Sequence, residues 1–596
     1  MNDSGDLMPP APPTPPTPPI WAGGPVPPAD NPAPLSLPSG TASFWSKYWR
    51  FLVPAAGVVV VAAAVAGALV LLKPAATVEK MVPASANLLV IANVDPSVTQ
   101  KVNLMRALHS FPDLKTDKAL TDKIDQAFKD SGLSFTSDVQ PWLGAEAGFS
   151  AKVSLQNTTN MPGALYLVSR DDTKAAAALA KLRSGKWGST YRWSDQTYNG
   201  IQISVGTPKS AGQQAGAYAI VDHVVVFGSS AAAIDEIIDA DQGRTARLVD
   251  SAAFKATLNG LPSDRLGWLY LDGKSLVASI KKGMATTPAV SASSLKSLAD
   301  LDAFVGIGGT VSASGDGLLA DVRIKIDQSK LTAATRQAMA NAGRPETVLR
   351  WVPRGSDAFL AFGNLNQTIK SVLDQAGSDP TVSGTTDAVG LTGANGVLSH
   401  LTGDAGIELE VGTRVIPSGA ILLGTDNAGS MTNFLKNVLA MATQLGVGGS
   451  GAASSPSANL KTTTYRGVVI TSYGGSATGI AATAFQPSYA VFDKMGILAS
   501  NVAEVKAVLD AHLGGATIAG DATYQTALAG SLRQPSAIVY VNTGSLVAAI
   551  RRLSAESGLA SVDTKTLDTL APIKSLIVTA SSQADAMLER IFVVIK

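Results

Sequence analysis

Hydrophobic residues follow two different patterns along this chain. The first is one continuous run at Phe51–Leu72, which holds 22 residues without a charge. At 1.5 Å rise per residue, a helix of that length spans about 33 Å, slightly more than the hydrocarbon core of a bilayer. The second pattern, beyond Lys80, consists of short apolar stretches that alternate with polar residues or recur at helical spacing. Together they predict one transmembrane helix followed by a large globular part.

The residues around the run support a membrane anchor. Trp45, Tyr48 and Trp49 precede it, where amphipathic rings favour the headgroup region. We predict a span with this aromatic flank at 45–73 and a linker at 74–80. A buried core helix is the alternative, but core helices are rarely apolar on every face. Two basic residues flank each end, so charge does not orient the helix. The preceding tail is short and lacks an export signal, which favours a cytoplasmic N-terminus and extracytoplasmic C-terminal domains.

Residues 1–44 form a proline-rich tail that holds 14 of the 32 prolines. The run Pro9–Pro19 cannot build a packed core and favours polyproline II, so we predict that this tail is disordered. In one interpretation the tail is a solvated spacer. In the other it binds the aromatic groove of a cytoplasmic partner.

Composition excludes several classes of function. Beyond Lys80 there are 43 basic and 42 acidic residues, and this balance argues against a nucleic-acid surface, which needs clustered positive charge. The chain has no cysteine, so disulfides, thiolate nucleophiles and zinc–cysteine sites are excluded. The four histidines are far apart in sequence, and helical metal pairs are therefore absent. We predict no metal and no cofactor.

The strongest internal signal is a long repeat. The segment from Tyr270 (YLDGKSL) matches the segment from Tyr540 (YVNTGSL), and the segment from Tyr218 (YAIVD) matches that from Tyr489 (YAVFD). The matches keep their order, and their offsets differ only as loop insertions would make them differ. We predict two copies of one ectodomain unit with a linker helix between them, at 81–328, 329–350 and 351–596.

The two copies share one predicted order of elements. A strand (Asn87–Val94 in the first copy) precedes an alanine-rich helix (Thr173–Leu182), and Asn199-Gly200 is the tight-turn signal of a hairpin. Alternation in Asp321–Asp327 and Glu589–Lys596 predicts terminal strands with one wet face. Strands come in runs with helices between them. The predicted fold class is α+β: one N-terminal transmembrane helix followed by two duplicated domains of mainly antiparallel sheet with packed helices.

No motif in the chain carries a complete catalytic signature. Two polar positions recur in both copies: Glu146 aligns with Asp404, and Asp272 aligns with Asn542. A recurrent acid can bind a ligand or act in acid–base catalysis, but residues of this kind more often accept backbone N–H bonds in turns and helix caps. We assign no catalytic, cofactor-binding or metal-binding residue.

One segment carries a family resemblance. Met81-Val-Pro, an Asp95-Pro-Ser turn and the segment Asp138–Gly144 (DVQPWLG) resemble the uncharacterised bacterial membrane-protein family known as domain of unknown function 3352. The resemblance implies a similar architecture and no assigned activity, cofactor or catalytic residue. By their chemistry, Asp95 and Asp138 are predicted to cap turns or helices, and Trp142 to be a buried anchor. The second copy has Ser399–Thr402 where the first has Pro141–Gly144.

These observations leave two main functional hypotheses and a third possibility, a structural spacer with cytoplasmic signalling through the proline-rich tail. The first is a single-pass, non-enzymatic envelope protein held in the lipid bilayer by residues 51–72, which binds an extracytoplasmic protein or a lipophilic ligand. The alternative is an envelope enzyme with a dispersed acidic site built from Glu146, Asp404 or Asp272. An enzyme predicts a cleft with converging titratable groups, whereas a binding module predicts an apolar cavity or an exposed apolar patch.

Overall fold

The computed structural model describes most of the chain beyond residue 77. The described residues are 78–129, 131–154, 161–210, 215–285, 300–340, 343, 345–376, 380–393, 396–412, 417–444, 460–473, 486–557 and 564–596. The predicted proline-rich tail and the predicted span at 51–72 lie outside them. Within the described residues, no helix has both the length and the apolar composition needed to cross a membrane.

The first repeat contains ten described strands and seven described α-helices. The strands are β1 Leu88–Asn93, β2 Leu143–Ala151, β3 Gly163–Ser169, β4 Tyr191–Tyr198, β5 Ile201–Pro208, β6 Gly216–Val221, β7 Val224–Gly228, β8 Gly267–Asp272, β9 Phe304–Ser314 and β10 Gly317–Ile326. The helices are α2 Val98–His109, α3 Asp117–Lys129, α4 Asp172–Ser184, α5 Lys186–Thr190, α6 Ala231–Asp241, α7 Ala252–Leu258 and α8 Gly273–Ala285. Helices α10 (Ala333–Ala340) and α11 (Glu346–Leu349) follow, where the sequence predicts a linker helix.

The second repeat shows the same succession. Its described strands are β11 Ala358–Phe362, β12 Leu401–Glu410, β13 Ser418–Thr425, β14 Leu460–Tyr465, β15 Val468–Tyr473, β16 Ser488–Phe492, β17 Met495–Ala499, β18 Ala537–Val541, β19 Ile573–Gln583 and β20 Ala586–Ile595. Its described helices are α12 Leu365–Ala376, α13 Pro380–Ala388, α14 Ala428–Gln444, α16 Val502–His512, α17 Ala522–Ala529, α18 Thr543–Ser557 and α19 Thr564–Leu570.

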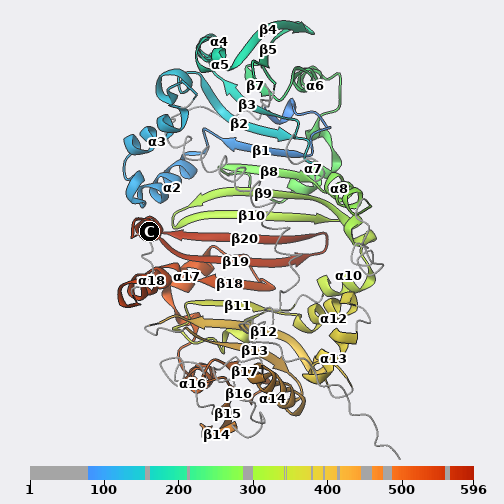
Figure 1. The fold of residues 1–596 in the computed structure, drawn as a ribbon, viewed down its shortest axis with the longest axis vertical. Coiled ribbons are helices and arrows are strands. Elements are labelled where there is room, and N and C mark those ends of the chain that lie inside the picture. The colour runs from blue at the N-terminus through green and yellow to red at the C-terminus, as the bar shows by residue number, and fades with distance from the viewer. Residues whose placement is uncertain are drawn as a thin grey trace, which may run out of the picture. The chain divides into compact units, whose positions relative to one another are not determined.

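All twenty of these strands join one antiparallel sheet (Figure 1). Successive pairings give the order β4-β5-β6-β7-β3-β2-β1-β8-β9-β10 in the first half. The second half continues as β20-β19-β18-β11-β12-β13-β17-β16-β15-β14. The predicted α+β class with antiparallel strands is confirmed, and the two copies share a sheet through the pairing of β10 with β20.

A local pseudo-two-fold axis relates the two repeats at their junction. Asp321 on β10 lies opposite Arg590 on β20, and the Arg590 guanidinium donates to Asp321 at 2.6 Å. On either side the registers match, because Tyr270 pairs with Leu89 and Gly308 just as Tyr540 pairs with Phe359 and Ile577. Each repeat therefore contributes its last strand to the centre of the sheet.

Local turn chemistry explains the outer hairpins. The β4–β5 turn holds Asn199 and Gly200 at φ of 46° and 85°, as its Asn-Gly sequence predicts. The equivalent β14–β15 turn holds Arg466 and Gly467 at 49° and 81°. Both residues of such a turn need positive φ, which places glycine at its second position.

One face of the sheet is packed against helices in both repeats. Helices α6 and α7 cover it in the first repeat with Ile234, Ile237 and Phe254, which pack on Tyr270 and its neighbours. Helices α16 and α17 cover it in the second with Val505, Val508 and Tyr524. We call this side the helix-covered face, and it contains the two largest buried cores.

On the opposite face, the described helices pack on the outer strands and at the ends of the central strands, where Leu104 of α2 packs with Val311 and Met339 of α10 with Ile324. In the first repeat α3 and α4 pack on the outer strands, with Leu120, Leu179 and Leu182 buried there. In the second repeat α14 does the same with Met431 and Leu435. Between these clusters, no described helix lies across the central strands (Figure 1).

Candidate functional site: an apolar sheet face

The uncovered face of the central strands is built from apolar side chains. Alternate residues of each strand point to this side, and cross-strand partners line up along one row perpendicular to the strands. We call this row, which crosses eight adjacent strands from β13 to β9, the apolar row. Its members are Ile421, Ile407, Leu360, Val539, Val578, Ile591, Ala320 and Val311.

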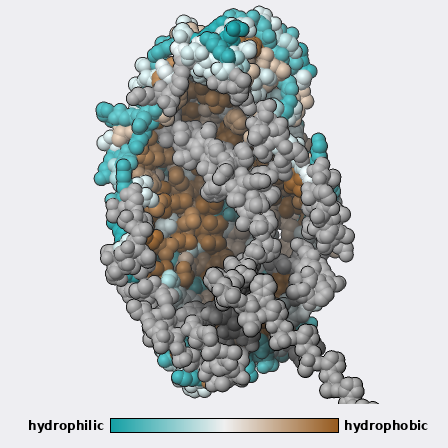
Figure 2. Space-filling view, viewed as in Figure 1, coloured by the Kyte–Doolittle hydropathy of each residue, from teal (hydrophilic) through white to brown (hydrophobic). Residues whose placement is uncertain are grey.

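The apolar row is accessible at its surface. Ile407 is 48% exposed, Ile421 39% and Val539 36%, large values for branched aliphatic side chains in the middle of a sheet. On either side of the row lie further aliphatic residues of the same face, such as Ile324, Val593 and Leu576. Figure 2 shows hydrophobic side chains gathered over the central part of this face. We call the whole surface the apolar floor.

The dimensions of the apolar row suit a chain-like ligand. Eight strands at about 4.8 Å separation give a row of about 34 Å. An acyl chain spans half of a bilayer core, about 15 Å. Because every strand backbone in the row is paired with neighbours on both sides, the floor presents few hydrogen-bonding groups to a ligand.

Helices stand at the two ends of the central strands. Helix α2 lies at the β9–β10 hairpin, where Asn103 Nδ2 donates to Ala313 O at 3.3 Å. Helix α8 begins at the opposite end of β9, where a Cβ on Gly273 would lie 2.6 Å from Val305 C, so only glycine allows this approach. In the second repeat, Thr543 Oγ1 at the start of α18 donates to Ile573 O at 2.7 Å.

The recurrent acidic positions serve the fold. Asp272 Oδ1 accepts the Ser275 N–H at 2.7 Å and so caps α8, and its Oδ2 accepts the Tyr270 hydroxyl at 3.1 Å. Asn542 does the same for α18 by accepting the Ser545 N–H at 3.1 Å. The alignment of Asp272 with Asn542 therefore reflects one shared helix cap.

The other recurrent pair lies in β2 and β12. Glu146 is buried and accepts the Val78 N–H at 3.3 Å. Asp404, its counterpart, is half-buried, and burial raises its pKa. No group of three or more acidic or histidine side chains that could hold a metal ion occurs in the described part of the chain.

The family-like segment of the first repeat is structural. Trp142 is buried, as predicted, and its Nε1 donates to Asp138 O at 2.7 Å. Asp138 accepts the Ser134 N–H at 2.8 Å, and Lys181 pairs with it at 2.7 Å. Asp95 forms an ion pair with Lys101. The N-cap of α2 is Ser97, which accepts the Gln100 N–H at 3.2 Å.

A buried carboxyl pair in the second repeat was not predicted from the sequence. Glu408 of β12 and Glu504 of α16 are both buried on the helix-covered face and interact directly. The Ser356 hydroxyl donates to Glu408 Oε2 at 3.0 Å, but no donor reaches Oε1 of either glutamate. Burial, and then the charge of Glu504, raise the pKa of Glu408 to about 9. The alternation of the strand points the other way, because it places Ile407 with Leu409 and Glu408 with Glu410 and so predicts buried aliphatic and exposed acidic side chains.

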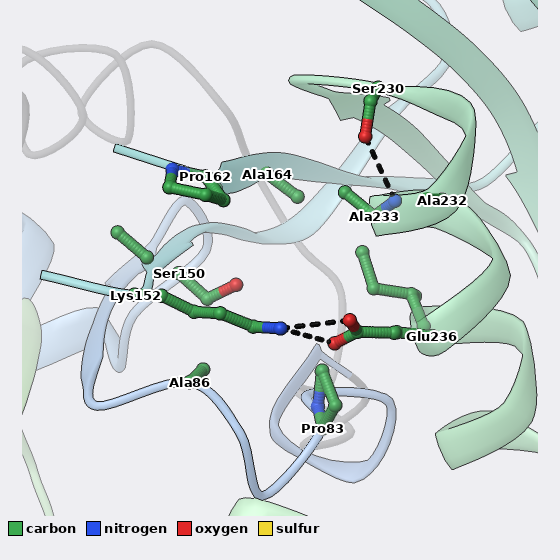
Figure 3. A pocket seen from close by; sticks show the side chains of 13 residues that line it. Pro83, Ala86, Ser150, Lys152, Pro162, Ala164, Ser230, Ala232, Ala233 and Glu236 are labelled. Carbon is green, nitrogen blue, oxygen red and sulfur yellow. Dashed lines mark hydrogen bonds and ion pairs between the residues drawn. The ribbon is translucent and has the colours of Figure 1, made fainter. Parts of the chain in front are cut away.

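The first repeat has a small cavity in the equivalent place. Cross-strand registers place Ser150 where the second repeat has Glu408, and Ala233 takes the place of Glu504 on the helix. The space is about 190 Å³ (Figure 3), and Lys152 pairs across it with Glu236 at 2.8 Å. Cofactor and drug-sized ligands need about 300–1,000 Å³, so this cavity is too small for them.

Comparisons with known proteins give one strong match. The family model described as "Protein of unknown function (DUF3352)" matches residues 52–446 and 417–588. Among curated proteins, none matches the chain. Two solved structures, titled "Structure of crystal form III of TP0453" and "Structure of crystal form IV of TP0453", each align with a TM-score of 0.23. Identities are 9% and 8%, with 45% and 42% of this chain and 87% and 81% of those chains covered. A TM-score of this size supports no conclusion.

Proposed function

Since the chain belongs to the DUF3352 family of proteins of unknown function, whose description assigns no activity, we propose a function from the geometry of this molecule. The protein is a non-enzymatic binding module of the cell envelope, anchored by residues 51–72 with its repeats outside the cytoplasm. Its apolar floor binds the hydrocarbon part of a lipophilic ligand.

The observation that carries this proposal is the apolar row. A continuous apolar row across eight strands is unusual on a soluble surface, because apolar patches on most monomers are small. Fully burying an exposed valine or isoleucine contributes about 1.5–3 kcal/mol. Because Ile407, Ile421 and Val539 are 36–48% exposed, covering one of them contributes about 0.5–1.5 kcal/mol, and a chain lying along several of them gains useful affinity. A hydrocarbon ligand also suits the floor because the floor presents few hydrogen-bonding groups that would need a partner.

The predicted membrane tether favours a lipid over a soluble protein as the ligand. A tether at residues 51–72 would hold the repeats within reach of the bilayer surface, where acyl chains are concentrated. The alternative, a dispersed acidic site, has less support: Asp272 is a helix cap, and Glu146 is buried against the backbone of Val78.

The test uses photolabelling of the full-length protein in membranes. A lipid carrying a photoreactive group on its acyl chain is activated, and labelled peptides are mapped by mass spectrometry. We expect adducts on the eight strands of the apolar row, from β13 to β9, and a loss of about tenfold in Val539→Asp. The matched control is Val469→Asp, because Val469 is 57% exposed on β15, away from the floor. Equal labelling of the two variants, or adducts confined to residues 51–72, would refute the proposal.

A further inference from the structure

One acidic side chain interrupts the apolar floor. Glu589 on β20 lies opposite Val322 on one side and Ala580 on the other. Along its own strand, the next residues on the same face are Met587 and Ile591. Glu589 is half-buried, and it forms no hydrogen bond or ion pair with any other described residue. Among the described residues it is therefore a carboxylate without a partner, set between the hydrocarbon side chains of the floor.

The neighbouring cations are already engaged on the other face. Arg590 pairs with Asp321 at 2.6 Å, while Arg323 and Lys325 both pair with Asp585. These side chains point toward the helix-covered face, because they alternate with the floor residues along β10 and β20. No basic side chain of these strands is thus available to Glu589.

The fold does not require a carboxylate at this position. Under the pseudo-two-fold, Glu589 faces Ala580 and Val322 as Ala320 faces Val311 and Ile591. The first repeat thus builds the equivalent site with alanine. A glutamate here is also unfavourable for a purely hydrocarbon ligand, because covering it would remove its water without supplying a partner.

We propose that Glu589 binds the cationic amine of an amphiphilic ligand whose hydrocarbon chain lies on the apolar floor. This inference rests on the proposed function and adds the headgroup chemistry of the ligand. An ammonium group would replace the water around the carboxylate with a charge-assisted hydrogen bond. An anionic headgroup would instead be repelled and would leave both charges unpaired.

The experiment compares two photoreactive probes in membranes holding the full-length protein. The probes are a long-chain amine and a fatty acid that share the same diazirine-bearing chain and differ only at the headgroup. We expect the amine to label floor peptides about ten times more than the acid, which corresponds to one charge-assisted hydrogen bond. In Glu589→Gln the preference for the amine should disappear while total labelling of the floor persists. Glu346→Gln, at an exposed carboxylate of α11, is the matched control and should keep the preference for the amine.

The outcomes separate this inference from the proposed function. Floor labelling without a preference for the amine, or a preference that survives in Glu589→Gln, overturns the role of Glu589 and leaves the floor as a lipid site. Absence of floor labelling by both probes, with no difference between Val539→Asp and Val469→Asp, overturns the two together.

Discussion

The buried carboxyl pair predicts an unusual dependence of stability on pH. Glu408 and Glu504 each present a buried oxygen without a donor, so the folded protein needs a proton between them. Replacing Glu408 by glutamine keeps the shape of the side chain and supplies an N–H donor in place of that proton. The variant should therefore keep the fold and lose the pH dependence that the pair introduces.

The sign and size of the effect follow from linkage. Burial and the neighbouring Glu504 raise the pKa of Glu408 to about 9 in the folded protein, against an ordinary value of 4.5 when the chain is unfolded. Between these values the folded state binds more protons than the unfolded state, so stability is greatest at low pH and falls as pH rises. Each pH unit costs about 1.4 kcal/mol, which makes a loss of about 3 kcal/mol between pH 6 and pH 8.

The assay is urea denaturation of the wild type and Glu408→Gln at pH 6, 7 and 8. Because other titratable groups contribute equally to both proteins, the difference between their unfolding free energies isolates the pair. We expect this difference to shift by about 3 kcal/mol in favour of the variant across that range. Glu410→Gln, at the half-buried neighbour on β12, should retain most of the wild-type slope. If the free energy of unfolding changed with pH in the same way for wild type and Glu408→Gln, the shared proton would be refuted.

Two further substitutions test the framework that supports the floor. Asn542→Ala removes the acceptor for the Ser545 N–H at the start of α18 and should lower the free energy of unfolding by about 1 kcal/mol. Urea denaturation measures this change, with Asn542→Asp as the conservative control. Arg590→Met leaves Asp321 buried without its partner and should lower the free energy of unfolding by about 3–5 kcal/mol. Adding Asp321→Leu should restore most of that loss. A double variant as unstable as the single one would contradict this reasoning.

The sequence predicted those features that depend on local chemistry or on internal similarity. The matches from Tyr270 to Tyr540 and from Tyr218 to Tyr489 coincide with equivalent strands, β8 with β18 and β6 with β16. The helix predicted at 173–182 is α4, and the Asn199-Gly200 turn closes β4 and β5. Side-chain spacing and turn residues carry this information within a few neighbouring positions, so no tertiary context is needed.

The apolar floor could not be predicted in the same way. Alternation at Asp321–Asp327 indicates two faces but does not state what covers each of them. In the structure Asp321 is buried and paired, while Val322 and Ile324 on the other face are only half-buried. This arrangement arises because Arg590, which lies 269 positions further along, supplies the countercharge. The period of the hydrophobic pattern alone cannot identify a partner so distant in sequence.

The duplication explains how the floor continues from one repeat into the other. In one repeat alone, β10 would be an edge strand with unpaired backbone groups, and so would β20 in the other. Their mutual pairing removes both edges and brings the aliphatic residues of β8 to β10 alongside those of β18 to β20. Neither repeat contains the whole apolar row, since Ala320 and Val311 come from the first and Ile591, Val578 and Val539 from the second. The six members from the second repeat already span about 24 Å at the spacing of paired strands, and the pairing of β10 with β20 extends the row to eight strands.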